Sequence, residues 1–257
     1  MSGAAQHDQI AAKLLEKPDG ARIAYRYTPG KSPGIVFMGG FASDMTGTKA
    51  VSLEAMALER GQAFLRFDYQ GHGESSGQFI DGGIGIWHSD ALAVFDVITE
   101  GPQIVVGSSM GGWMMLLTAI SRANRIAGLV GIASAPDFTQ DLMWNQFDEA
   151  TREIIRNVGV LYEPSEYGAP LPITLNLIME GQKHLLLKGP LPITAPIRLL
   201  HGMRDPDVPY QLSLRIAEAV EGDDVEVHLI KDGDHRLSTE RDLALLNRYV
   251  ADLCDRV

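Results

Sequence analysis

Short apolar runs alternate along the chain with longer stretches in which apolar residues recur at helical spacing. The runs are candidate strands and cover residues 35–38, 63–67, 104–106, 126–132, 197–200 and 225–230. The helical patterns lie between most of them, over residues 49–60, 87–98, 110–120, 210–219 and 240–253. Strands that are apolar along nearly their whole length are buried on both faces, so the pattern predicts an α/β fold with a mainly parallel sheet between helices. Residues 14–16 and 23–27 flank a Pro-Asp-Gly turn and predict an N-terminal hairpin.

One long stretch, residues 136–196, interrupts this alternation. It contains several helix-like patterns, no convincing buried strand, and prolines at 136, 164, 170, 172, 190, 192 and 196. A structureless loop of this length is improbable in a compact domain. We therefore expect residues 136–196 to form a mostly helical cap. This cap is inserted into an α/β core of residues 1–135 and 197–257, which has the size of one domain.

Composition limits the kinds of binding partner and the cellular location that we expect. The net charge is −11, whereas nucleic acids and anionic lipid surfaces attract basic proteins, so neither is an expected partner. No apolar run reaches the roughly 18 residues of a membrane span, and residues 1–8 have neither the basic nor the apolar region of a secretion signal. The lone cysteine, Cys254, excludes an intramolecular disulfide and is expected to be passive. These features predict a cytoplasmic protein without a transmembrane anchor, and they leave its oligomeric state open.

The first catalytic candidate is a serine between a strand and a helix. Residues 107–111 read Gly-Ser-Ser-Met-Gly, follow an apolar run and precede the apolar stretch 113–120. At such a turn the central serine exposes its hydroxyl, and small neighbours are needed because a side chain would collide with adjacent backbone. Ser109 is therefore the predicted nucleophile. The same five-residue pattern recurs around Ser75, but there no strand enters the turn and no helix leaves it, so Ser75 is the weaker candidate.

A serine hydroxyl becomes a nucleophile when a histidine accepts its proton, and that histidine needs a carboxylate to orient it. The order expected for such a sheet is serine, acid, histidine. His235 follows the last apolar run and is the predicted base, while His72 and His88 precede the acid and His201 reads as a structural residue. The acid comes from the loop after residue 200, which contains both Asp205 and Asp207. Spacing before Val208-Pro209 favours Asp205.

The remaining acidic candidates have structural interpretations. Asp232 and Asp234 are too close to His235 in sequence and are expected to shape its turn, and Asp68 is expected to stabilise its own loop. A tetrahedral oxyanion needs two N–H donors. The backbone of Met110 supplies one, and the Gly-Gly-Phe turn after residue 38 makes the backbone of Phe41 the predicted second donor, although an ordinary glycine turn would look the same.

Together these segments resemble the α/β-hydrolase superfamily over essentially the whole chain. The resemblance lies in Gly-Gly-Phe at 39–41, Arg-Phe-Asp-Tyr-Gln-Gly-His-Gly-Glu-Ser at 66–75, Gly-Ser-Ser-Met-Gly-Gly-Trp at 107–113, the Asp205 loop and the Asp-His pair at 234–235. Residues 101–113, 195–203 and 234–236 are similar to the mitochondrial palmitoyl-protein thioesterase and acyl-glucuronide esterase family. That resemblance implies a Ser109, Asp205 and His235 triad acting on thioesters or esters, with no metal or organic cofactor. The chain departs from the family in lacking a basic, serine-rich transit segment, which again favours a cytoplasmic location.

The expected substrate is a small molecule or an acylated protein. A carboxylesterase of small molecules, or a carbon–carbon bond hydrolase or perhydrolase with the same triad, is the alternative, and a non-catalytic binding scaffold is the least favoured reading. Within the cap, Trp144, Phe147, Tyr162 and Met179 are the predicted substrate contacts. The further apolar candidates are Leu142, Met143, Leu161, Leu175 and Ile178, and the candidate charged contacts are Arg152, Arg156, Lys183 and Arg204. Cap packing explains most of the apolar residues equally well, and a solvated surface explains the basic ones.

Overall fold

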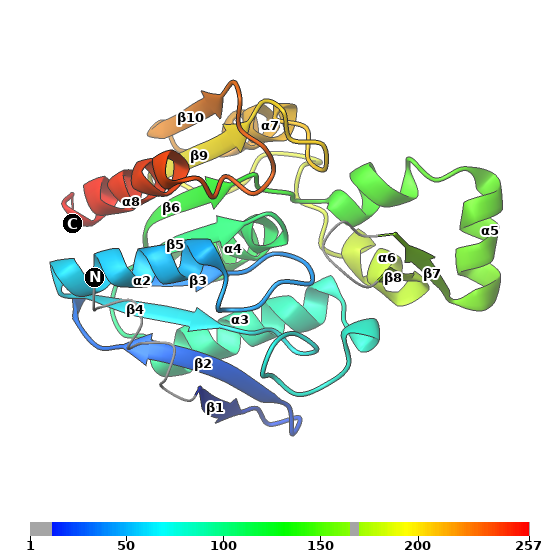
Figure 1. Cartoon of the computed structure of the whole chain (residues 1–257), viewed down its shortest axis with the longest axis horizontal. Coiled ribbons are helices and arrows are strands. Elements are labelled where there is room, and N and C mark those ends of the chain that lie inside the picture. The colour runs from blue at the N-terminus through cyan, green and yellow to red at the C-terminus, as the bar shows by residue number, and fades with distance from the viewer. Residues whose placement is uncertain (1–11, 165–169, 257) are drawn as a thin grey trace.

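A computed structural model describes residues 12–164 and 170–256 (Figure 1). Residues 1–8, on which the predicted absence of a secretion signal depends, lie outside this range. An eight-stranded sheet runs in the order β1-β2-β4-β3-β5-β6-β9-β10. Its strands are β1 (Lys13–Glu16), β2 (Arg22–Thr28), β3 (Lys31–Met38), β4 (Gln62–Phe67), β5 (Gln103–Ser108), β6 (Ile126–Ile132), β9 (Ile197–Gly202) and β10 (Val225–Ile230). The pairs from β4 to β10 are parallel, while β1 and β2 pair antiparallel as the predicted hairpin, and β2 pairs antiparallel with β4.

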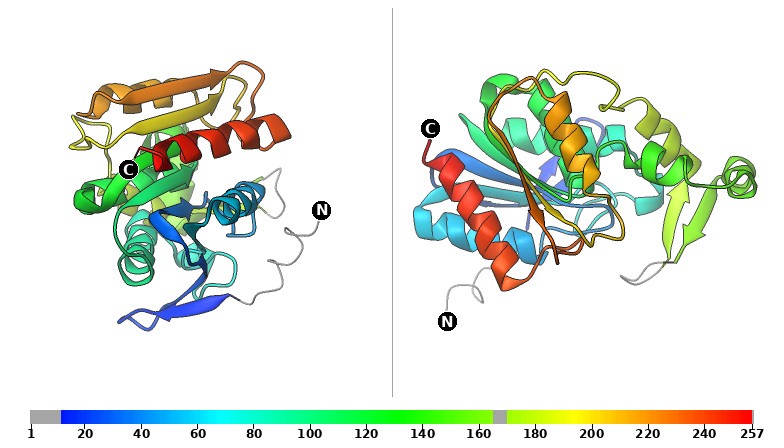
Figure 2. Two further views of the ribbon diagram at one scale, coloured as in Figure 1. Left: turned by 90° about the vertical axis from the view of Figure 1, so that its left-hand side faces the viewer. Right: turned by 90° about the horizontal axis from the view of Figure 1, so that it is seen from above.

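Helices cover both faces of this sheet, which confirms the predicted α/β class (Figure 2). Helices α3 (Ile84–Ile98), α4 (Met110–Ser121) and α7 (Gln211–Ala219) pack their apolar residues into one core. On the opposite face, α2 (Thr48–Arg60) and α8 (Glu240–Cys254) close a second core. Every residue of β4, β5 and β9 is buried, which explains why apolar residues predominate along these strands. None of the described helices combines the length and hydrophobicity that a membrane span requires.

The elements between β6 and β9 project from the end of the sheet at which the parallel strands finish (Figure 1). They are the π-helix η3 (Thr139–Trp144), α5 (Glu149–Val158), β7 (Val160–Glu163), β8 (Leu171–Thr174) and α6 (Leu175–Gln182). Beside these helices the segment contains a strand pair that the sequence did not indicate, in which β7 and β8 pair antiparallel. Each has four residues, of which none in β7 and only two in β8 are buried, so neither leaves the apolar signature of a core strand.

Buried polar groups fix the loop that follows β3. Arg66 on β4 donates one hydrogen bond to the carbonyl of Met45, at 2.7 Å, and another to the carboxylate of Glu54 on α2, at 2.6 Å. The Asp68 carboxylate accepts the Met45 N–H at 2.7 Å and the Glu74 N–H at 2.8 Å. Asp68 therefore joins the loop after β3 to the loop after β4, which confirms its predicted structural role. Both loops contribute to the site described next.

Candidate active site

Ser109 lies at the sharp turn between β5 and α4. Its φ of 55° and ψ of −120° are unusual for a residue with a side chain, and such strain persists only where neighbours hold it. Here the Ser109 N–H donates to the carbonyl of Ile132 at 2.9 Å. Its own carbonyl accepts from the N–H groups of Gly112 and Ala135, at 2.8 and 3.0 Å. The turn is thus held by β6 and by the first turn of α4, with the hydroxyl left for other partners.

The glycines of the turn allow this close approach. A Cβ on Gly107 would lie 2.3 Å from the carbonyl oxygen of Gly111, and a Cβ on Gly111 would lie 2.0 Å from that of Met38. Neither position can hold a side chain without moving backbone. Glycine at 107 therefore lets the start of α4 approach β5, and glycine at 111 lets it approach the end of β3. This contact sets Ser109 beside the turn that contains Phe41.

Two loops bring a histidine and a carboxylate to Ser109. His235, in the loop after β10, has its Nε2 3.1 Å from the Ser109 Oγ. Its Nδ1 is 2.7 Å from an oxygen of Asp205, which lies in the loop after β9. The structure therefore joins Ser109, His235 and Asp205 in one hydrogen-bonded chain, in the order that proton transfer from a serine requires.

The Asp205 carboxylate is held rigidly and almost completely buried, with 1% of its side chain exposed. One oxygen accepts the N–H groups of Asp207 and Val208, both at 2.8 Å. The other faces His235 and, at 3.3 Å, the Nε2 of His201. Burial raises the pKa of Asp205, but the hydrogen bonds from the two histidines outweigh burial and hold that pKa well below its usual value. The group is therefore a carboxylate at neutral pH, able to stabilise a positive charge on His235.

His201 is fully buried and supports this loop, in keeping with its predicted structural role. Its Nδ1 is 2.7 Å from the hydroxyl of Ser213, and its Nε2 is 2.9 Å from the carbonyl of Val208. The Nε2 must carry a proton, because a carbonyl can only accept. The contact between His201 and Asp205 joins residues four apart at the end of a strand. This spacing is visible in the sequence but does not by itself predict the contact.

The competing serine and aspartates have other partners. The Ser75 hydroxyl donates to the carbonyl of Asp68 at 2.7 Å and accepts the N–H of Ala24 at 2.8 Å, so it joins backbone segments. Asp234 accepts the N–H of Leu237 at 2.9 Å and shapes its turn, as predicted, while the Asp232 carboxylate pairs with Arg241. His88 is partly buried in α3.

Asp207 lies closer to the site than the other rejected candidates. One of its carboxylate oxygens is within 4.8 Å of ligand atoms of both Asp205 and His235, although Asp207 itself is exposed. Among the described residues these three groups are near enough to share a cation. Hydrogen bonds already occupy both oxygens of Asp205, so the donor set is better explained as a carboxylate that orients a histidine.

The two predicted oxyanion donors come from segments that adjoin Ser109. Met110 is the first residue of α4, where a backbone N–H has no partner within its own helix. The turn that contains Phe41 approaches from β3, and a Cβ on Gly40 would lie 3.4 Å from the Cβ of Ser109. The Phe41 ring packs edge-on against Phe79, with ring centres 4.9 Å apart.

The predicted substrate contacts fall into two groups. Trp144 and Phe147 pack with neighbouring apolar residues around a small core of the cap, as do Met143, Leu161, Leu175 and the buried Ile178. Tyr162 and Met179 face solvent, with 59% and 50% of their surfaces exposed. Arg152 and Arg156 pair with Glu149, and Lys183 pairs with Glu180. Arg204 is exposed in the loop that carries Asp205.

An open groove of about 480 Å³ lies between the cap and the Asp205 loop. The cap contributes Leu142 and Gln146, and the remaining lining residues are Met203, Asp205, Pro206, Asp207, Pro209, Tyr210 and Gln211. Of the cap residues predicted as substrate contacts, Leu142 lines this groove, whereas Trp144, Phe147, Tyr162 and Met179 do not.

Comparisons with known proteins place this site in context. Residues 33–174, more than half of the chain, match the family model described as serine aminopeptidase, S33. The chain is 41% identical over 253 residues to the Bos taurus protein named palmitoyl-protein thioesterase ABHD10, mitochondrial, covering 97% of this chain and 82% of that protein. The structure of mouse alpha/beta hydrolase domain-containing protein 10 superposes with a TM-score of 0.89, at 40% identity, over 96% of this chain and 99% of that one. A hydrolase from Agrobacterium vitis S4 gives 0.90, at 37% identity, over 95% and 97%.

These comparisons correct one expectation. The prediction of a cytoplasmic location is wrong, because similar proteins from cattle, mouse and human are all named mitochondrial. The prediction depended on a single cysteine and on missing signals. Such absences do not identify a compartment.

Proposed function

We propose, from the premise that this chain belongs to the α/β-hydrolase family that includes the ABHD10 palmitoyl-protein thioesterases, that Ser109, His235 and Asp205 form the catalytic triad of an acyl thioesterase. The chain is an enzyme, a serine hydrolase of thioesters or carboxylic esters. The observation that carries the triad assignment is the continuous hydrogen-bonded chain from the Ser109 hydroxyl through His235 to Asp205.

In this mechanism the Ser109 oxygen attacks the acyl carbon while His235 accepts the hydroxyl proton. The Asp205 carboxylate stabilises the imidazolium that results, and the N–H groups of Met110 and Phe41 bind the oxyanion. His235 then protonates the departing thiolate or alkoxide, which leaves the acyl group on Ser109. Water repeats both steps, with His235 as base and then as acid, and releases a carboxylic acid and the free serine.

The groove beside Asp205 is the proposed acyl site. Its volume lies within the usual range of ligand sites, about 300–1,000 Å³. Four of its nine lining residues, Leu142, Met203, Pro206 and Pro209, are apolar and offer contacts to an acyl chain, and the others are more polar. This proposal replaces an acyl slot built from Trp144 and Phe147, because those two side chains pack against the core of the cap.

We therefore expect kcat/KM to rise with acyl length in a series of acyl thioesters, by about 0.8 kcal/mol or roughly fourfold per methylene buried, until the groove is full. Met203→Ala should flatten this dependence and leave short acyl substrates unaffected. Leu214→Ala is the matched control, because Leu214 on α7 is 40% exposed, like Met203 at 41%, but does not line the groove. A profile independent of acyl length in the unmodified protein would contradict an acyl site in the groove.

Acyl-glucuronides are the second proposed substrate class, favoured by the position of Arg204. This side chain is exposed and precedes Asp205 in the chain, and in this proposal its guanidinium binds the carboxylate of a sugar acid. The same assay with acyl-glucuronides and with nitrophenyl esters of one acyl group separates the possibilities. If Arg204→Gln loses activity towards the acyl-glucuronide alone, this substrate class is supported. If the variant and the unmodified protein hydrolyse the acyl-glucuronide at equal rates, a role for Arg204 is excluded.

A further inference from the structure

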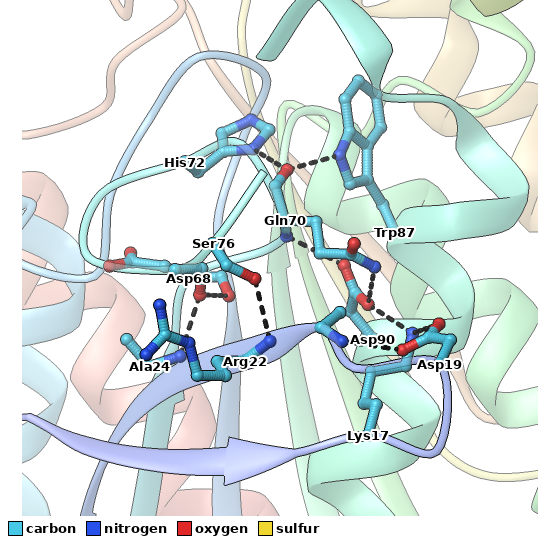
Figure 3. A network of polar contacts seen from close by, with 12 residues as sticks. Lys17, Asp19, Arg22, Ala24, Asp68, Gln70, His72, Ser76, Trp87 and Asp90 are labelled. Carbon is cyan, nitrogen blue, oxygen red and sulfur yellow. Dashed lines mark hydrogen bonds and ion pairs between the residues drawn. The ribbon is translucent and has the colours of Figure 1, made fainter. Parts of the chain in front are cut away.

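The loop after β4 carries a buried histidine that contacts the turn holding Phe41. Figure 3 shows His72 at the end of a polar network that begins at Lys17. The His72 side chain is buried, and its Nε2 lies 3.2 Å from the backbone nitrogen of Ala42, the residue after Phe41. The positive φ of Ala42, 54°, is an unfavourable conformation for a residue with a side chain. This part of the turn therefore needs an external partner to hold it.

The partners of His72 determine where its proton lies. A backbone N–H can only donate, so the Nε2 accepts the Ala42 N–H and carries no proton of its own. The proton of the neutral ring is then on Nδ1, which lies 3.2 Å from the carbonyl oxygen of Gln70 and donates to it. Burial lowers the pKa of His72, which keeps the ring neutral at pH 7.

The groups behind His72 hold Gln70 in place. Its carbonyl also accepts the indole N–H of Trp87 at 3.1 Å. The backbone and side-chain N–H groups of Gln70 donate to the two oxygens of Asp90, at 2.8 and 2.9 Å. Asp90 is fully buried and pairs with Lys17 at 2.8 Å, as Figure 3 shows. The acceptor that fixes the tautomer of His72 is thus anchored to α3 and to the N-terminal hairpin.

Aromatic packing fixes the plane of the His72 ring. The ring meets Phe79 and Trp87 edge-on, with centres 4.9 and 5.2 Å apart. The Phe41 ring packs on the same two residues, at 4.9 and 5.8 Å. His72 and Phe41 therefore pack against the same aromatic side chains, so a shift of the histidine ring would displace the turn that contains Phe41.

We propose that His72 is a positioning residue for the oxyanion hole, and that it orients the Phe41 N–H by accepting the N–H of Ala42. This role rests on the proposed function, in which the Phe41 N–H binds the oxyanion. His72 touches neither substrate nor Ser109 in this role. Its effect falls on the transition state, because negative charge develops on the acyl oxygen only after the serine attacks and is absent from the bound substrate.

The test compares His72→Phe, which keeps the aromatic packing and removes the acceptor, with His72→Gln, whose side-chain carbonyl can accept from Ala42. One readout is kcat and KM for an acyl thioester. The other is the affinity of a trifluoromethyl ketone bearing the same acyl chain, which adds to the Ser109 oxygen and places an oxyanion in the hole. The melting temperature of each variant is measured alongside.

His72→Phe should lower kcat by about tenfold to a hundredfold, with little change in KM, and weaken the ketone by a similar factor. His72→Gln should recover most of both losses. Unchanged kcat and ketone affinity in His72→Phe would overturn the proposal, as would equal losses in both variants that follow the fall in melting temperature. An unmodified protein that hydrolyses neither thioesters nor esters would instead overturn the proposed function, and the positioning role with it.

Discussion

Ser109→Ala is expected to abolish turnover and fluorophosphonate labelling while leaving the melting temperature nearly unchanged. Without the hydroxyl no acyl-enzyme can form, and loss of such a nucleophile lowers kcat by a factor on the order of 10⁶. The effect on folding should be small, because the side-chain hydroxyl bonds to His235 while backbone groups hold the turn. Turnover assays, labelling and thermal unfolding of the variant check each part.

Ser75→Ala is the matched control, since the same five-residue pattern surrounds this serine. Its hydroxyl makes two hydrogen bonds to backbone groups, so the variant should lose about 1–2 kcal/mol of unfolding free energy. Labelling and kcat should stay close to those of the unmodified protein. Labelling that survives in Ser109→Ala and disappears in Ser75→Ala would show that the nucleophile is misassigned.

Asp205→Asn should lower kcat by about 10³ to 10⁴. An amide has no charge with which to stabilise the imidazolium of His235, and it can select the wrong tautomer of that ring. If the amide NH₂ group of the variant took the place of the oxygen that accepts the Asp207 and Val208 N–H groups, donors would face donors and those hydrogen bonds would be lost. Steady-state kinetics at saturating substrate measures the loss directly.

Asp207→Asn provides the comparison for the acid. Asp207 is near His235 but exposed, and water weakens the effect of an exposed charge. We expect a much smaller loss than at Asp205. Similar losses in the two variants would leave neither carboxylate as the sole acid, and a larger loss in Asp207→Asn would transfer the role to Asp207.

Much of the core could be predicted from the sequence, because each strand of a doubly covered parallel sheet is apolar along its length. β6 begins and ends at the predicted residues for this reason. β10 also has the predicted bounds, although it lies at the edge of the sheet and is mostly only half-buried. The turn at Ser109 could also be predicted, because the close backbone contacts there require glycine and the glycines appear in the sequence pattern. Strands β7 and β8 were missed because each has only four residues, too few to give a periodic signal.

Contacts between residues far apart in the chain could not be predicted from the sequence. Trp144 and Phe147 could line a slot or pack a small core, and composition is the same in both cases. The histidine in the segment 66–75 was visible, yet its bond to Ala42 joins residues 30 apart through two loops. Only the folded arrangement of β3 and β4 brings those loops together.

The most direct test of an acyl-enzyme at Ser109 is mass spectrometry of the protein quenched with acid during turnover of an acyl nitrophenyl ester. We predict a mass increase equal to one acyl group, located on the peptide that contains Ser109 and absent from Ser109→Ala. An acyl group attached to any other residue, or full turnover by Ser109→Ala, would contradict the proposed mechanism.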